Sequence, residues 1–179
     1  MSEAPLRLCG VFMSRNDIGS SLDRAGDVAL VERGHPRLLV VKCPCGCGEE
    51  YVINLDQGAG KAWRLYRRAG KLSLFPSVWR DVGCRSHFIL WRDRFYLFDR
   101  RYEAEDELPD LGTRSLDIAI LNTASTVTYR TVQELADALD EIPWEVLLSC
   151  RRLARLGLLK EGQGDLVGSF RRSPEDDSV

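Results

Sequence analysis

The stretch Cys43-Pro44-Cys45-Gly46-Cys47-Gly48 places three cysteines at alternate positions. In an extended strand all three side chains would share one face, but the outer two would lie about 13 Å apart at roughly 3.3 Å per residue. One metal ion, about 2.3 Å from each sulfur, could not hold both of them. Proline favours a bend, and glycine permits the conformations in which a backbone wraps around thiolates. We therefore expect this segment to curl around a metal ion.

A second group of donors lies in Gly83-Cys84-Arg85-Ser86-His87, where a spacing of three brings the Cys84 sulfur and the His87 imidazole to one side of a tight turn. Zinc prefers four such ligands in a tetrahedron, and ligands from two chain segments couple zinc binding to folding. Cys43, Cys45, Cys47, Cys84 and His87 are thus five candidates for about four positions on one Zn²⁺ ion. The set we expect is three cysteines with His87; the alternative is all four cysteines, with His87 outside the ligand set.

The remaining cysteines and histidine do not join this pattern. Cys9 and Cys150 lie in apolar settings, where a lone cysteine is usually a small buried hydrophobe. His35 precedes Pro36 in an expected turn, so we expect a surface residue. Trp63, Trp79 and Trp91 lie in or near expected strands around the site, where they would form core and shield the thiolates.

Composition describes an ordinary soluble protein and names no partner. The 179 residues are 44% hydrophobic and carry a formal net charge of -2, so the basic excess typical of nucleic-acid binding is lacking. The N-terminus lacks the pattern of a secretory signal, and no apolar run approaches membrane-spanning length. We expect a cytoplasmic protein, in which clustered cysteines favour metal over disulfides.

The first hundred residues have the pattern of a β-rich domain. Short β-branched and aromatic runs alternate with turn residues, and no long helix fits among them. The expected strands are Leu6 to Phe12, Val28 to Glu32, Arg37 to Lys42, Tyr51 to Leu55, Trp63 to Arg67, Lys71 to Phe75, His87 to Trp91 and Phe95 to Asp99.

The spacing of apolar residues changes from that of strands to that of helices after an acidic segment that contains Pro109 and Gly112. Thr131 and Glu134 form a capping-box pattern that predicts a helix, and Pro143 predicts the first turn of another, which Gly157 ends. A less regular helix is expected at Ser115 to Asn122. Two strands, Leu158 to Glu161 and Asp165 to Phe170, would complete a winged helix.

The predicted fold class is therefore α+β, with a small all-β zinc-binding domain followed by a winged-helix-like domain. The expected bounds are residues 1–100 for the β-rich domain, 101–114 for a linker, 115–172 for the winged-helix-like domain and 173–179 for a disordered tail.

The stretch from Val40 to Phe98 resembles a bacterial zinc-binding family still labelled domain of unknown function 6527, some members of which are encoded beside ubiquitin-like conjugation components. The resemblance rests on a cysteine segment, a Pro-Ser pair, a Trp and a Cys-Arg-Ser-His motif, here Cys43 to Gly48, Pro76-Ser77, Trp79 and Cys84 to His87. It implies metal binding and a protein-modification pathway. Typical members are shorter, so the region from Leu116 to Arg172 is an added module.

These observations favour a zinc-stabilised adaptor that binds other proteins, among them ubiquitin-like conjugation components, over an enzyme. One alternative is a zinc-dependent hydrolase with an open metal position and Glu49, Glu50 or Asp81 as general base. Another is DNA binding through Arg151, Arg152 and Arg155. Residues 115–179 hold seven basic and eleven acidic residues, a net charge of -4, which argues against nucleic acid.

Overall fold

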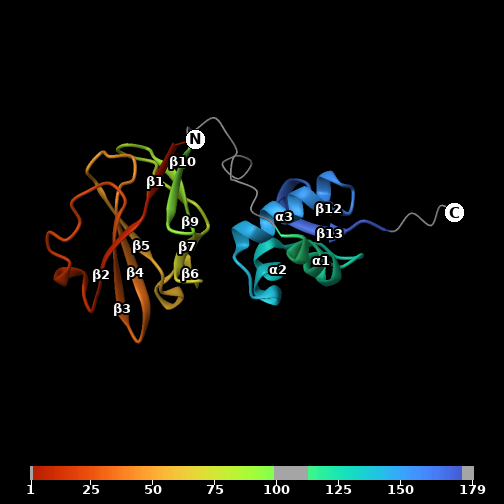
Figure 1. Ribbon diagram of the computed structural model, residues 1–179, viewed down its shortest axis with the longest axis horizontal. Helices are drawn as coiled ribbons and strands as arrows, with labels where there is room; N and C mark the ends of the chain where they lie inside the picture. The colour runs from red at the N-terminus through yellow and green to blue at the C-terminus, as the bar shows by residue number, and fades with distance from the viewer. Residues whose placement is uncertain (1, 99–112, 175–179) are drawn as a thin grey trace. The chain divides into compact units, whose positions relative to one another are not determined.

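The computed structural model describes residues 2–98 and 113–174. The chain divides into two compact units, Met1–Ala104 and Glu105–Val179. The first consists mostly of sheet and the second contains three helices, so the predicted mixed α+β class is confirmed (Figure 1). Among the described residues, no helix is both long and apolar enough to cross a membrane.

A four-stranded sheet with the order β2-β3-β4-β5 forms one layer of the first unit. Strand β2 (Arg7–Phe12) pairs in parallel with β3 (Asp27–Arg33), while β4 (His35–Lys42) and β5 (Glu50–Asn54) continue the sheet antiparallel. Figure 1 shows these strands in red to orange. The cysteine segment is the loop that joins β4 to β5.

A second four-stranded sheet has the order β1-β10-β9-β8 and is antiparallel throughout. Its strands are β1 (Ser2–Pro5), β8 (Val78–Trp79), β9 (His87–Trp91) and β10 (Arg94–Phe98). A separate hairpin pairs β6 (Arg64–Arg68) with β7 (Lys71–Phe75). Cys84 lies in the loop before β9.

The main core joins these sheets because alternate side chains of each strand point to it. Val28 and Leu39 from the first sheet share one buried cluster with Phe88 and Leu90 from the second. Cys43 is fully buried in this cluster, and Cys84 packs against it. The sulfur-bearing loops are therefore anchored at the edge of the main core.

In the second unit, α1 (Arg114–Thr123), α2 (Val132–Leu139) and α3 (Pro143–Arg155) precede a small sheet. The sheet has the order β11-β13-β12, formed by Arg130–Thr131, Ser169–Arg172 and Leu159–Glu161. The predicted capping box is present, because Thr131 and Glu134 each bond the other's backbone N–H. Three helices followed by β12 and β13 are compatible with a winged helix, which stays a prediction.

Several expected elements differ from the structure. The residues Asp165 to Val167 are not a strand: Gly164–Leu166 form a 3-10 turn, and β13 begins only at Ser169, after Gly168 at φ 78°. The short strands β1, β8 and β11 were not predicted, since two to four residues carry no readable period. Most of the expected linker and tail lies outside the described residues.

Candidate metal centre

The loop between β4 and β5 curls as its proline and glycines predict. The Gly46 amide donates to the Cys43 carbonyl at 3.1 Å, and the Cys43 amide donates to the Glu49 carbonyl at 2.8 Å. Gly46 and Gly48 have φ values of 84° and 83°, in the left-handed region that side chains disfavour. These two turns bring three cysteine side chains back toward one point.

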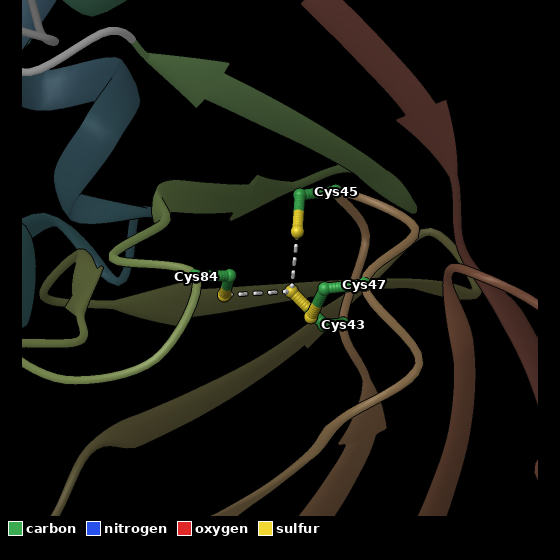
Figure 2. Close-up of side chains that lie close together, drawn as sticks. All are labelled: Cys43, Cys45, Cys47 and Cys84. Atoms are coloured by element: carbon green, nitrogen blue, oxygen red, sulfur yellow. Dashed lines mark hydrogen bonds between the residues drawn. The ribbon is translucent and has the colours of Figure 1, made fainter.

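Four sulfurs meet there, those of Cys43, Cys45, Cys47 and Cys84, and all lie within 4.8 Å of one another. Figure 2 shows their side chains, with Cys84 approaching from the loop before β9. In a tetrahedron with bonds of about 2.3 Å, neighbouring sulfurs lie about 3.8 Å apart. The Cys43 sulfur is 3.8 Å from that of Cys84 and 3.2 Å from that of Cys45. The cluster is thus compatible with one zinc ion.

Two hydroxyl groups border the cluster on its buried side. The Tyr51 hydroxyl and Ser86 Oγ are 2.6 Å apart, and Ser86 Oγ lies 3.4 Å from the Cys43 sulfur and 3.5 Å from the Cys84 sulfur. Burial raises the pKa of Cys84, but hydrogen bonds from Ser86 and Tyr51 outweigh it and bring this pKa to about 6. One thiolate is therefore stabilised at Cys84 at neutral pH.

His87 lies apart from the sulfur cluster. It is buried, with its ring 4.5 Å from that of Trp79 and 5.5 Å from that of Phe98, measured between centroids. Among the described residues, neither of its ring nitrogens has a hydrogen-bond partner. Burial lowers its pKa to about 4, so the imidazole is neutral at physiological pH.

This separation follows from strand geometry. Side chains alternate along β9, so Ser86 and Phe88 face the main core while His87 points to the opposite side. Val78 is paired with Phe88 and Trp79 with His87, which extends the same alternation to β8. The structure thus brings together four of the five predicted donors and leaves the fifth on the far face of the sheet.

The other residues considered from sequence occupy different settings. Cys150 is buried in α3, whereas Cys9 is only half-buried. His35 is exposed, 4.0 Å from the Asp56 carboxylate. Trp91 is buried, but Trp79 is 55% exposed.

The acidic candidates for a general base lie among basic side chains or in solvent. Glu49 pairs with Arg80 at 2.7 Å, and Glu50 pairs with Lys42 at 3.5 Å. Asp81 is exposed. None of these carboxylates belongs to the group of potential metal donors found among the described residues.

Tyr51, Ser86 and Arg80 lie near the sulfurs although no motif in the sequence predicted them there. The Arg80 guanidinium lies 5.1 Å from the centre of the Tyr51 ring. Ser86 stands between two predicted donors in the Cys-Arg-Ser-His motif, and Tyr51 opens the strand after the cysteine loop. Those positions are the only sequence signal for Ser86 and Tyr51, because a hydroxyl has no spacing rule of its own.

The site thus defines the first unit as a β-rich unit with a four-thiol cluster able to hold a metal ion. Residues 14–98 match a family model described as "Bacterial ubiquitination-like system serine protease (BubE)". The match covers just under half of the 179 residues and ends with β10. It fits the expected link to a ubiquitin-like system, but not the numbered family or the added C-terminal module. No curated protein and no solved structure matches the chain.

Proposed function

We propose that residues 2–98 form a serine peptidase unit of a bacterial ubiquitination-like system, with a structural zinc ion at the four cysteines. The observation that carries this proposal is the match of residues 14–98 to a family described as a serine protease of such a system. Its partners would be proteins of that pathway. The zinc would stabilise the fold, and the reaction would be carried out by other residues.

A structural role for zinc is supported by the number and type of donors. Four thiolates complete a tetrahedron and leave no position for a catalytic water. Two of the three carboxylates considered as a base are paired, Glu49 with Arg80 and Glu50 with Lys42, and the third, Asp81, is exposed. This arrangement argues against a zinc-dependent hydrolase. It favours a reaction whose catalytic residues lie away from the metal.

The proposed general base is His87. The chain contains two histidines, and His35 is an exposed residue at the start of β4 with Asp56 beside it. His87 is neutral, and its two ring nitrogens have no partner among the described residues. A serine peptidase needs a neutral imidazole that can accept the proton of the serine hydroxyl.

The proposed nucleophile is Ser77, which comes directly before β8. Val78 faces the main core, so alternation assigns Ser77 to the side of the sheet that carries Trp79 and His87. The Trp63 indole donates to the Ser77 carbonyl at 3.2 Å and fixes this segment. Ser86, although adjacent to His87 in sequence, faces the sulfurs instead.

In the proposed reaction, Ser77 Oγ attacks the carbonyl carbon of the scissile amide while His87 takes the hydroxyl proton. The C–N bond breaks as His87 gives that proton to the leaving amine, which produces an acyl-serine. Water then hydrolyses the ester, again with His87 as base. No net oxidation or reduction takes place.

A fluorophosphonate probe tests this without a known substrate, because an activated serine displaces its fluoride. We expect the zinc-loaded full chain to be labelled at Ser77, as located by peptide mass. Ser77→Ala should abolish labelling, and His87→Gln should slow it by about 10²–10⁴-fold. His35→Gln and Ser20→Ala are matched controls, expected to label at the normal rate. Labelling at another serine would overturn the choice of Ser77, and no labelling would overturn the peptidase proposal.

The second candidate is the adaptor predicted from the sequence, and the closed thiolate site favours it. An adaptor would bind pathway proteins without reacting with the probe. In the second unit, Arg152 pairs with Asp117 at 2.6 Å and Arg151 with Glu161 at 3.9 Å. These pairs neutralise part of the arginine row, so protein contacts are better supported for that unit than DNA binding.

A further inference from the structure

The four sulfurs differ in their surroundings. Cys45 and Cys47 are exposed, whereas Cys43 is fully buried and Cys84 is half-buried against the main core. The residues of the first pair are open to solvent. Charge on the second pair must be stabilised by the protein, because burying an ionic group without partners is costly.

That stabilisation matters because four thiolates around Zn²⁺ carry a net charge of −2, and hydrogen bonds to metal ligands set their orientation and basicity. The hydroxyls of Tyr51 and Ser86 reach only the protected pair. Ser86 Oγ is 3.4 Å from the Cys43 sulfur, and the Tyr51 hydroxyl is 3.5 Å from the Cys84 sulfur. Both residues are buried.

The two hydroxyls act as one chain. They are 2.6 Å apart, so one hydroxyl hydrogen lies between them, and the other is left to point at a sulfur. Arg80 places its guanidinium over the Tyr51 ring at 5.1 Å and is held there by Glu49 at 2.7 Å. Arg80 also interacts electrostatically with Cys84.

We propose that Tyr51 and Ser86 are positioning residues for the metal site, whose hydroxyl chain stabilises the thiolates of Cys43 and Cys84 and so sets the zinc affinity. This inference rests on the proposed zinc site. It assigns Ser86 to the metal centre, although Ser86 directly precedes His87 in the sequence and could be taken for a catalytic serine.

The test compares the full chain with Tyr51→Phe, Ser86→Ala and the double variant in competition with a chromophoric zinc chelator. Tyr51→Phe keeps the ring that contacts Phe88 and Arg80 and removes only the hydroxyl. Tyr96→Phe is the matched control, since Tyr96 is equally buried but lies on β10 beside Trp91. Circular dichroism of the zinc-saturated proteins checks that each variant is folded.

We expect each single variant to bind zinc about 10–100-fold more weakly, as for other partners of metal ligands. The double variant should be little weaker than either single one, because the hydroxyls form one chain. The cobalt-substituted variants should keep sulfur-to-metal charge-transfer bands but at shifted energy, a change that a purely structural role would not cause. Tyr96→Phe should leave both readouts unchanged.

Wild-type affinity in both Tyr51→Phe and Ser86→Ala would overturn this inference and leave the zinc site in place. If the losses of zinc-binding free energy in the two single variants added fully in the double variant, the two hydroxyls would act independently and not as one hydrogen-bonded chain. If the wild-type chain bound no zinc, the proposed metal site would fall, and this inference with it. The three results are distinguishable in one titration series.

Discussion

Asp27 offers a sharp test of how the first unit is held together. It is 1% exposed at the start of β3, and its Oδ2 accepts the backbone amides of Asp23 at 2.9 Å and Arg24 at 2.8 Å. The carboxylate also pairs with Arg7, its register partner on β2. One buried charge therefore joins the loop before β3 to the neighbouring parallel strand.

Asp27→Asn keeps an oxygen for the two amides but removes the charge and turns an NH₂ group toward Arg7. Hydrogen bonds to a charged group contribute about 1.5–3 kcal/mol and neutral ones about 1 kcal/mol. Each bond therefore weakens by about 0.5–2 kcal/mol, and the two together cost about 1–4 kcal/mol of unfolding free energy. For a unit of this size the melting temperature should fall by about 4–8 °C for each kcal/mol lost.

The assay is urea unfolding of the zinc-loaded full chain, followed by tryptophan fluorescence. Glu3→Gln is the control, because Glu3 forms an exposed pair with Arg94 at 3.2 Å that should contribute less than about 1 kcal/mol. A loss below about 0.5 kcal/mol for Asp27→Asn at neutral pH would show that this carboxylate does not hold the loop to the neighbouring strand.

The pH dependence adds a second check. Burial alone would raise the pKa of Asp27, but the amides of Arg24 and Asp23 and the Arg7 guanidinium outweigh it and hold this pKa below 3.8. A lowered folded-state pKa means that the stabilisation is present above pH 3.8 and is lost as the pH falls through the folded value. The difference between wild type and Asp27→Asn should shrink in that acidic window. Loss of zinc in acid affects both proteins equally and so cancels in their difference. A stability difference that stayed constant in this window would contradict the lowered pKa of Asp27.

Three further predictions concern other parts of the chain. Gly26→Ala should destabilise the first unit by about 1–3 kcal/mol. Gly26 has φ 83°, and an added Cβ would lie 2.4 Å from the Pro5 carbonyl oxygen. Thermal melting measures the loss, with Gly19→Ala, where space for a Cβ is open, as the comparison. Burial raises the pKa of the Cys150 thiol to about 12, so Cys150 should react with a thiol reagent only after unfolding. Cys45 and Cys47 are exposed and should react in the native protein once a chelator is added. Thr131→Ala should cost the second unit about 1 kcal/mol, because the side chain caps α2 by accepting the Glu134 amide at 3.1 Å; chemical denaturation measures it, and no change would contradict the capping role.

Local signals in the sequence were sufficient for much of the fold. The strand at Lys71–Phe75 and that at His87–Trp91 have the predicted bounds, since each is a short apolar run between turn residues. The capping box at Thr131 fixed the start of α2 within one residue. Strand β8 has two residues and is defined only by its partner β9, so no local pattern could reveal it.

In the candidate site, too, local features could be predicted from the sequence and features that depend on packing could not. The turn residues around Cys43, Cys45 and Cys47 predicted a curled loop, because proline and glycine act locally. Whether His87 or a fourth cysteine completes the ligand set depended on which face of the sheet His87 occupies at the start of β9, and one position of offset reverses that face. The hydroxyls of Tyr51 and Ser86 come together only through the packing of two sheets, which spacing along the chain does not encode.

The zinc site at Cys43, Cys45, Cys47 and Cys84 is tested most directly by X-ray absorption at the zinc edge of the purified full chain, together with a metal count. We expect one zinc per chain with four sulfur neighbours at about 2.3 Å, and the same spectrum for His87→Gln. A spectrum with three sulfurs and one nitrogen that changes in His87→Gln, or well under one zinc per chain, would contradict it.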